Sequence, residues 1–131
     1  MTLGNSERLH ARHRLTAGAD YATLKAQGKA FRGAHCLLVV HAAPGETTRV
    51  GFVASKRGVG GAVQRNRARR RLREIVRRRW PRVPQTGFLM MFVAYRSVPT
   101  VPHQDLASDV EHVLAAAGAL APIMPSVGGA R

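Results

Sequence analysis

The part of this chain best equipped to do chemistry is an arginine-rich segment, residues 64–79. It holds nine arginines and one acid, Glu74. A guanidinium group is flat and permanently charged, and it donates paired hydrogen bonds to phosphate oxygens. If the segment is wound as an α-helix, one narrow side is apolar. That side consists of Ala68, Leu72, Ile75 and Val76. The pattern predicts an amphipathic helix that packs on a core by one face.

The polar side of this predicted helix indicates contact with nucleic acid. Its side chains stack at helical spacing and are Asn66, Arg69, Arg70, Arg73 and Arg77. Repulsion among so many like charges is relieved by a polyanion. The alternative is a solvated face in a chain that favours arginine, with 18 arginines and 3 lysines. Such a bias explains arginine in place of lysine, but it does not explain the absence of acids, so we favour nucleic acid.

The composition of the whole chain supports the same class of partner. The 131 residues allow one domain, and a net charge of +14 points to phosphate. A membrane surface is the competing polyanion, but it favours lysine with aromatic residues opposite, and only Trp80 lies near the helix. The longest apolar run, residues 88–95, is too short to span a bilayer, and the first fifteen residues contain no apolar signal segment. A lone cysteine, Cys36, excludes an internal disulfide framework. We therefore expect a cytoplasmic protein with no membrane partner.

Residues that could catalyse a reaction are not evident. The acids are scattered, and none forms a pair that could hold two metal ions for phosphodiester cleavage. His10 and His13 lack partner cysteines, so we expect no metal site. Gly58–Gly61 precedes the basic helix but lacks the Gly-Lys-Ser/Thr ending of a nucleotide-binding loop. The sequence predicts a binding protein with no catalytic residues of its own.

The first half of the chain reads as an arm, a short helix and two strands. Residues 1–13 are basic and aperiodic and predict a flexible arm. Thr16 predicts a helix cap, and Gly28 its end. Residues 35–43 predict a strand closed by a turn at 43–46. Residues 47–55 predict a second strand, which we expect to pair antiparallel with the first.

The second half predicts the basic helix, a central strand and a last helix. Pro81 ends the basic helix, and residues 84–87 form a loop. Residues 88–95 are apolar on both faces and predict a central strand. Residues 103–117 predict a helix with an apolar stripe of Leu106, Val110, Val113 and Leu114. The predicted fold is α+β, a small single-domain α/β sandwich spanning residues 14–118, followed by a flexible tail at 119–131.

Arg65–Glu74, preceded by Ala62-Val63-Gln64, resembles the Arg-Asn-Arg helix of the bacterial ribonuclease P protein component family. Three other pieces agree with that family in order and spacing. These are Arg14-Leu15 with Tyr21 and Gly28, the strand Arg49–Arg57 with its Ser-Lys-Arg ending, and the apolar strand 88–95 followed by Arg96 and a short helix. The resemblance covers residues 12–118.

The resemblance implies a fold and a function. The fold would be of the ribosomal protein S5 domain 2-like type, with a left-handed crossover around the basic helix. The chain would be the protein subunit of ribonuclease P, an endoribonuclease whose RNA subunit removes the 5′ leader of precursor tRNA with Mg²⁺, and one protein would serve each RNA. A different class, a structural RNA-binding protein such as a small ribosomal protein, is the alternative from composition alone. A stand-alone nuclease is disfavoured by the scattered acids.

The resemblance also implies two sets of site residues. The expected contacts of the basic helix with RNA are Arg65, Asn66, Arg67, Arg69, Arg70 and Arg73. The expected leader cleft contains Tyr21, Lys25 and Lys56. Lys25 stands where relatives often have a second aromatic residue, which would replace base stacking by a phosphate contact. No catalytic residue and no protein-bound metal is implied.

Overall fold

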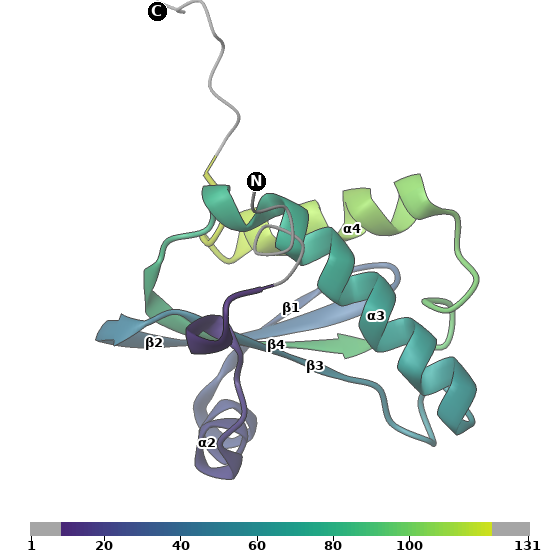
Figure 1. Cartoon of the computed structure of the whole chain (residues 1–131), viewed down its shortest axis with the longest axis horizontal. Coiled ribbons are helices and arrows are strands. Elements are labelled where there is room, and N and C mark those ends of the chain that lie inside the picture. The colour runs from purple at the N-terminus through teal and green to yellow at the C-terminus, as the bar shows by residue number, and fades with distance from the viewer. Residues whose placement is uncertain (1–8, 122–131) are drawn as a thin grey trace, which may run out of the picture.

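The computed structural model describes residues 9–121. The elements in chain order are η1 (Ala11–His13), α2 (Gly18–Gln27), β1 (Lys29–Arg32), β2 (Cys36–Thr47), β3 (Arg49–Val53), α3 (Ala62–Arg79), η2 (Trp80–Arg82), β4 (Thr86–Ala94) and α4 (His103–Ala116). Figure 1 shows α3 and α4 on one face of the sheet and α2 on the other. The predicted α+β sandwich is confirmed.

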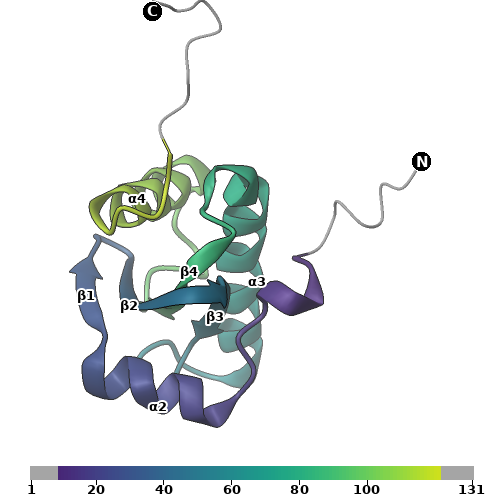
Figure 2. The same ribbon diagram turned by 90° about the vertical axis from the view of Figure 1, so that its left-hand side faces the viewer.

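The four strands lie in the order β1-β2-β4-β3. β4 is antiparallel to β2 and parallel to β3, so the chain must cross over one face of the sheet between β3 and β4. That crossover is α3. Figures 1 and 2 together show that it runs in the left-handed sense, against the general rule for parallel strands, as the resemblance implied.

The predicted antiparallel pairing of the strands at 35–43 and 47–55 is wrong. β4 lies between β2 and β3, so these two do not touch as neighbours. β4 takes the centre because it is the strand whose side chains are apolar on both faces. The predicted turn at 43–46 is also wrong, since β2 continues to Thr47 through an irregularity in which Gly45 adopts a φ of 83°.

Two smaller corrections concern the first helix and its neighbour. α2 is capped at Ala17 with no side-chain hydrogen bond, so Thr16 is not the cap. Gly28 does follow the last helical residue, but with a φ of −72°. A side chain there would collide with Val39 and with the Leu24 carbonyl, so space requires the glycine. The edge strand β1 was missed because its residues are mostly exposed and show no alternation.

The basic helix packs as its sequence predicts. Its buried residues are Ala68, Leu72, Ile75 and Val76. α3 ends at Arg79, and Pro81 lies in the η2 turn that follows. The predicted stripe of α4 is buried as well, and the helix ends at Ala116.

The core has two parts, one on each face of the sheet. The larger joins β2, β3 and β4 to α3 and α4, and includes Phe92, Leu72 and Leu106. The smaller lies under α2 and contains Leu15, Leu24, Val39, Ala43, Leu89 and Met91. Cys36 is fully buried, and burial followed by the charge of Asp109 raises the pKa of its thiol. This matches an inert structural cysteine.

The ends of the chain extend the folded part beyond the predicted boundaries. Leu9 and His13 are buried, so residues 9–13 belong to the packed domain and not to an arm. Ala119 is buried, and the Ala121 amide donates to the Arg82 carbonyl at 2.8 Å. The rest of the predicted arm and tail, residues 1–8 and 122–131, lies outside the described residues. No helix within residues 9–121 is long and apolar enough to cross a membrane.

The packing of α3 predicts opposite effects for two neighbouring positions. Leu72 is fully buried, so Leu72→Ala should cost about 2–5 kcal/mol in the free energy of unfolding. Arg70→Ala, at an exposed position of the same helix, should change it by less than about 0.5 kcal/mol. Chemical denaturation of both variants checks this. A destabilising Arg70→Ala beside a tolerated Leu72→Ala would mean that the faces of α3 are wrongly assigned.

Candidate RNA-binding surface

The first part of α3 presents a cationic face. Asn66, Arg67, Arg70 and Arg73 are exposed, and Arg65 and Arg69 are half-buried. Four of the predicted residues line one shallow concavity, namely Asn66, Arg69, Arg70 and Arg73. Arg69 is held there by hydrogen bonds to the Asn66 side-chain oxygen at 2.5 Å and to the Ala54 carbonyl at 3.5 Å. We call these four residues the α3 front.

Arg73 connects the α3 front to the sheet. Its guanidinium lies 5.6 Å from the ring centre of Phe52, which is stacked on Phe92. Burial, followed by the charges of Arg14 and Arg69, lowers the pKa of Arg73. These neighbouring positive charges raise the free energy of the unbound surface, and a bound anion would lower it.

Arg14 is a residue that sequence reasoning did not place in the site. Its segment lies along the free edge of β3, where the Leu15 amide donates to the Val50 carbonyl at 3.0 Å. The Arg14 side chain is exposed and donates to the Leu9 carbonyl at 3.1 Å. No local spacing relates residue 14 to the basic helix, so only tertiary structure could reveal this contribution.

Four other arginines of α3 make contacts within the fold. Arg71 donates to the carbonyls of Val98 and Val101, both at 2.6 Å, and so fixes the loop before α4. Arg79 forms an ion pair with Glu111 of α4 at 2.8 Å. Arg77, which the helical stripe had included, is paired with Glu74, as is Arg78. The last turn is therefore partly neutralised, while the α3 front is not.

The opposite face of the sheet, on the side of α2, carries a row of partly exposed side chains. Arg32, Leu37, Val93 and Val53 are register partners across β1, β2, β4 and β3. Register partners share a face, and the three apolar ones pack beside the core under α2. They are only half-buried, whereas Gly51, Met91 and Val39 in an adjacent row are buried. This half-exposed row, which we call the open row, lies beyond the cover that α2 provides.

Tyr21 borders the open row. It projects from α2, and a side chain at Gly51 of β3 would collide with its hydroxyl, so the glycine is what allows this close approach. The hydroxyl donates to the Leu15 carbonyl at 3.1 Å, and burial raises its pKa. Tyr21 is half-buried and packs beside Leu24, so it is partly core and partly accessible. Lys25 and Lys56 are both exposed.

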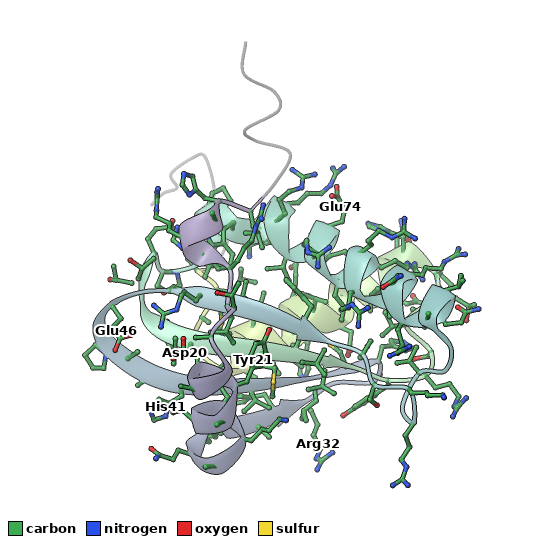
Figure 3. The ribbon with its side chains drawn as sticks, turned by 60° about the horizontal axis from the view of Figure 1, so that its bottom comes forward. Asp20, Tyr21, Arg32, His41, Glu46 and Glu74 are labelled. Carbon is green, nitrogen blue, oxygen red and sulfur yellow. The ribbon has the colours of Figure 1, made fainter. Side chains whose placement is uncertain are left out.

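The charges around this face are distributed unevenly. At one end Arg49 is neutralised by Asp20 at 3.1 Å and by Glu46 at 3.2 Å. Arg32, in the open row, is exposed. Figure 3 shows Glu46 and Arg32 on opposite sides of Tyr21. A negatively charged strand would therefore meet attraction along the open row and not at the Asp20–Glu46 end.

Residues 9–121 contain no group of three or more histidine, cysteine or acidic side chains that could hold a metal ion. His10 and His13 have separate contacts. His13 is buried against Trp80, and His10 is exposed and contacts Arg12. Within this part of the chain, the structure offers surfaces for binding. Together with the basic crossover helix, these features are those of a small α+β protein that binds nucleic acid.

Comparison with known proteins identifies the family. The family model described as Ribonuclease P matches residues 9–118. The ribonuclease P protein component of Symbiobacterium thermophilum is 40% identical over 111 residues, covering 82% of this chain and 93% of that protein. The corresponding protein of Chloroflexus aurantiacus is 40% identical over 103 residues, with coverages of 78% and 75%. The chain belongs to the ribonuclease P protein family.

Solved structures agree on the fold. The ribonuclease P protein of Staphylococcus aureus superposes with a TM-score of 0.71 at 20% identity, covering 82% of this chain and 97% of that one. The protein from Thermotoga maritima gives 0.68 at 22% identity, with coverages of 79% and 96%. Ribonuclease P is an endoribonuclease whose catalysis resides in its RNA subunit, which agrees with the prediction of a protein without catalytic residues. These matches give no support to the ribosomal-protein alternative.

The ion pairs of Glu74 predict a pH-dependent stability. Hydrogen bonds from Arg77 and then Arg78 lower the pKa of Glu74 from 4.5 to about 2. A lowered carboxyl pKa stabilises the fold above the ordinary pKa, and the gain is lost as the pH falls from about 4.5 to about 2. Because the side chain is 43% exposed, the gain is below about 1 kcal/mol.

Urea denaturation of wild type and Glu74→Gln at several pH values tests this. The difference in unfolding free energy should be constant above about pH 5 and should shrink on further acidification. A difference that is independent of pH, or that grows in acid, would contradict the role given to these ion pairs.

Proposed function

We propose that this chain assists the 5′ maturation of tRNA in the cytoplasm by binding two RNAs at once, with one protein per RNA subunit. The α3 front, together with Arg65 and Arg67, binds the ribonuclease P RNA. The open row and Tyr21 beside it bind the 5′ leader of precursor tRNA, with Lys25 and Lys56 as further contacts. The observation that carries the proposal is that an uncompensated guanidinium face lies on one side of the sheet and an accessible apolar row on the other.

The α3 front suits a folded RNA backbone. Its arginines are presented from a helix whose apolar side is packed in the core, so the backbone that carries them loses no conformational freedom on binding. Arg69 is already held in place by Asn66. Each phosphate contact made by such a group releases counterions, which makes binding strongly dependent on salt.

The open row suits a single strand. Leu37, Val93 and Val53 form an apolar floor, and Tyr21 adds an aromatic ring beside it. Bases of any sequence can stack on or lie against such a surface while cations contact the backbone. Arg32, Lys25 and Lys56 are exposed and able to supply those cations.

The catalytic Mg²⁺ ions belong to the RNA subunit and its substrate in this proposal. The protein lowers the requirement for them, because a surface rich in arginine replaces counterions that would otherwise screen the phosphates. The net charge of +14 is the source of this effect.

Reconstitution with the RNA subunit and precursor tRNA tests the function. The protein alone should not cleave, whereas protein with RNA should cleave at a lower Mg²⁺ concentration than RNA alone. Arg70→Ala should weaken binding to the RNA subunit and reduce the magnitude of its log–log salt slope by somewhat under about 1. Lys29→Ala is the matched control. It removes one exposed charge from β1, the strand at the opposite edge of the sheet from β3.

Two results would contradict the function. One is magnesium-dependent cleavage by nuclease-free protein without RNA. The other is an equal loss of RNA-subunit affinity in Arg70→Ala and Lys29→Ala, which would indicate charge attraction without a defined surface.

The leader contact predicts a selective effect at Tyr21. Tyr21→Ala should weaken the binding of precursor tRNA by about 1–3 kcal/mol, the value of one base stack, and should leave mature tRNA binding nearly unchanged. Tyr21→Phe is the matched control, since it keeps the ring and loses only the hydrogen bond to Leu15. Affinities of both tRNAs for the reconstituted enzyme, with thermal melts of each variant, give the result. Equal loss for the two tRNAs, or unfolding of Tyr21→Ala with normal binding by Tyr21→Phe, would assign Tyr21 to the core.

A further inference from the structure

A pocket at the far end of α3 belongs to neither surface described above. It is a cavity of about 360 Å³ between the N-terminal segment and the turn that follows α3. Its walls include Leu9, Arg12, His13, Arg77, Trp80 and Pro81. The volume falls within the range of about 300–1,000 Å³ typical of small-ligand sites.

The walls of this pocket are flat and mainly apolar. The rings of His13 and Trp80 meet edge to face, with centroids 5.1 Å apart and planes at 62°. Leu9 and Pro81 add aliphatic surface. Such walls suit a planar ring, which gains from stacking and from leaving water.

Two buried ring nitrogens of these walls lack hydrogen-bond partners among the described residues. His13 Nδ1 lies 2.7 Å from the Thr48 carbonyl oxygen, which can only accept, so Nδ1 carries the proton. In the neutral ring Nε2 is then an acceptor, and it is unpaired. The indole Nε1 of Trp80 is a donor, and it is unpaired as well. Leaving such groups unpaired is costly, and both atoms are shielded from solvent, so a ligand gains these hydrogen bonds when the pocket walls shift to admit it.

The combination of a donor and an acceptor identifies the chemistry of that ligand. A nucleobase edge offers both kinds of group, whereas a fully ionised phosphate offers acceptors only. Two arginines line the pocket. Arg12 is exposed, and Arg77 forms an ion pair with Glu74. An arginine beside an aromatic slot suits the phosphate attached to a base.

We propose that this pocket binds a single unstacked ribonucleotide of an RNA, with its base against Trp80 and His13 and its phosphate at Arg12. The proposal rests on the RNA-binding function and adds a contact to it at the end of α3 opposite the α3 front. Its base-sized slot recognises one extruded nucleotide, whereas the α3 front recognises backbone.

Trp80 is the only tryptophan in the chain, so its fluorescence reports directly on the pocket. Titration with the four ribonucleoside 5′-monophosphates, corrected for their absorbance, should give a saturable change for at least one of them. Ribose 5-phosphate and inorganic phosphate should bind on the order of tenfold more weakly, because they lack the stacked base. Equal responses to inorganic phosphate and to all four nucleotides would overturn the proposal in favour of a simple anion site.

Variants locate the binding. Arg12→Gln should raise the dissociation constant of the best nucleotide on the order of tenfold, because a charge-assisted hydrogen bond is lost. Arg70→Gln removes the same charge from the α3 front and should leave that constant unchanged. Trp80→Phe keeps an aromatic wall and removes the indole donor, and loss of binding can be followed by saturation-transfer NMR of the nucleotide. A larger effect of Arg70→Gln than of Arg12→Gln would overturn the assignment of the pocket.

Failure of this proposal can be separated from failure of the proposed function. If the wild-type protein lowers the Mg²⁺ requirement of the RNA subunit but shows no saturable nucleotide response, only the pocket is refuted. If nucleotides bind at Trp80 but the protein does not assist the RNA subunit, the pocket stands and the proposed function fails.

Discussion

The burial of β4 on both faces is the constraint on which the rest of this structure depends. Its side chains contribute Met90 and Phe92 to the larger core and Leu89 and Met91 to the smaller one. A strand that is apolar on both sides must lie inside the sheet with helices above and below. Once β4 is central and parallel to β3, the chain between them has to cross the sheet, and that crossing is the basic helix.

The crossover explains how so many arginines can sit on one helix without unfolding it. Four apolar side chains fix α3 to the core. The arginines on its other sides differ in whether an acidic side chain neutralises them. Near the C-terminal end Glu74 and Glu111 neutralise arginines, and the helix dipole favours positive charge there. Among the described residues, no acidic side chain forms an ion pair with the arginines of the α3 front. The protein therefore retains electrostatic repulsion at the α3 front, which a bound polyanion would relieve.

The N-terminal segment joins the surfaces to one another. Leu15 belongs to the core under α2, and its carbonyl holds Tyr21. Arg14 lies close enough to Arg73 to affect its pKa, and His13 packs on Trp80 at the end of α3. Three consecutive residues thus contribute to the core under α2, the surroundings of the α3 front and the pocket. This follows from their position beside the free edge of β3, where one short extended stretch borders both faces of the sheet.

The sequence by itself determined the elements with a strong period and the class of partner. The stripe Ala68, Leu72, Ile75 and Val76 and the central strand at 88–95 were predicted correctly, because hydrophobic periodicity reflects local geometry. The Arg-Asn-Arg motif indicated the family. Tertiary structure alone decided the strand order, since pairing of β4 with both β2 and β3 depends on packing between distant segments. It also decided which arginines make contacts within the fold. Arg71 donates to two backbone carbonyls of the loop before α4, whereas its neighbour Arg70 is exposed. The contribution of Arg14 and the pocket of His13 and Trp80 arise from residues more than fifty positions apart, which no local pattern relates.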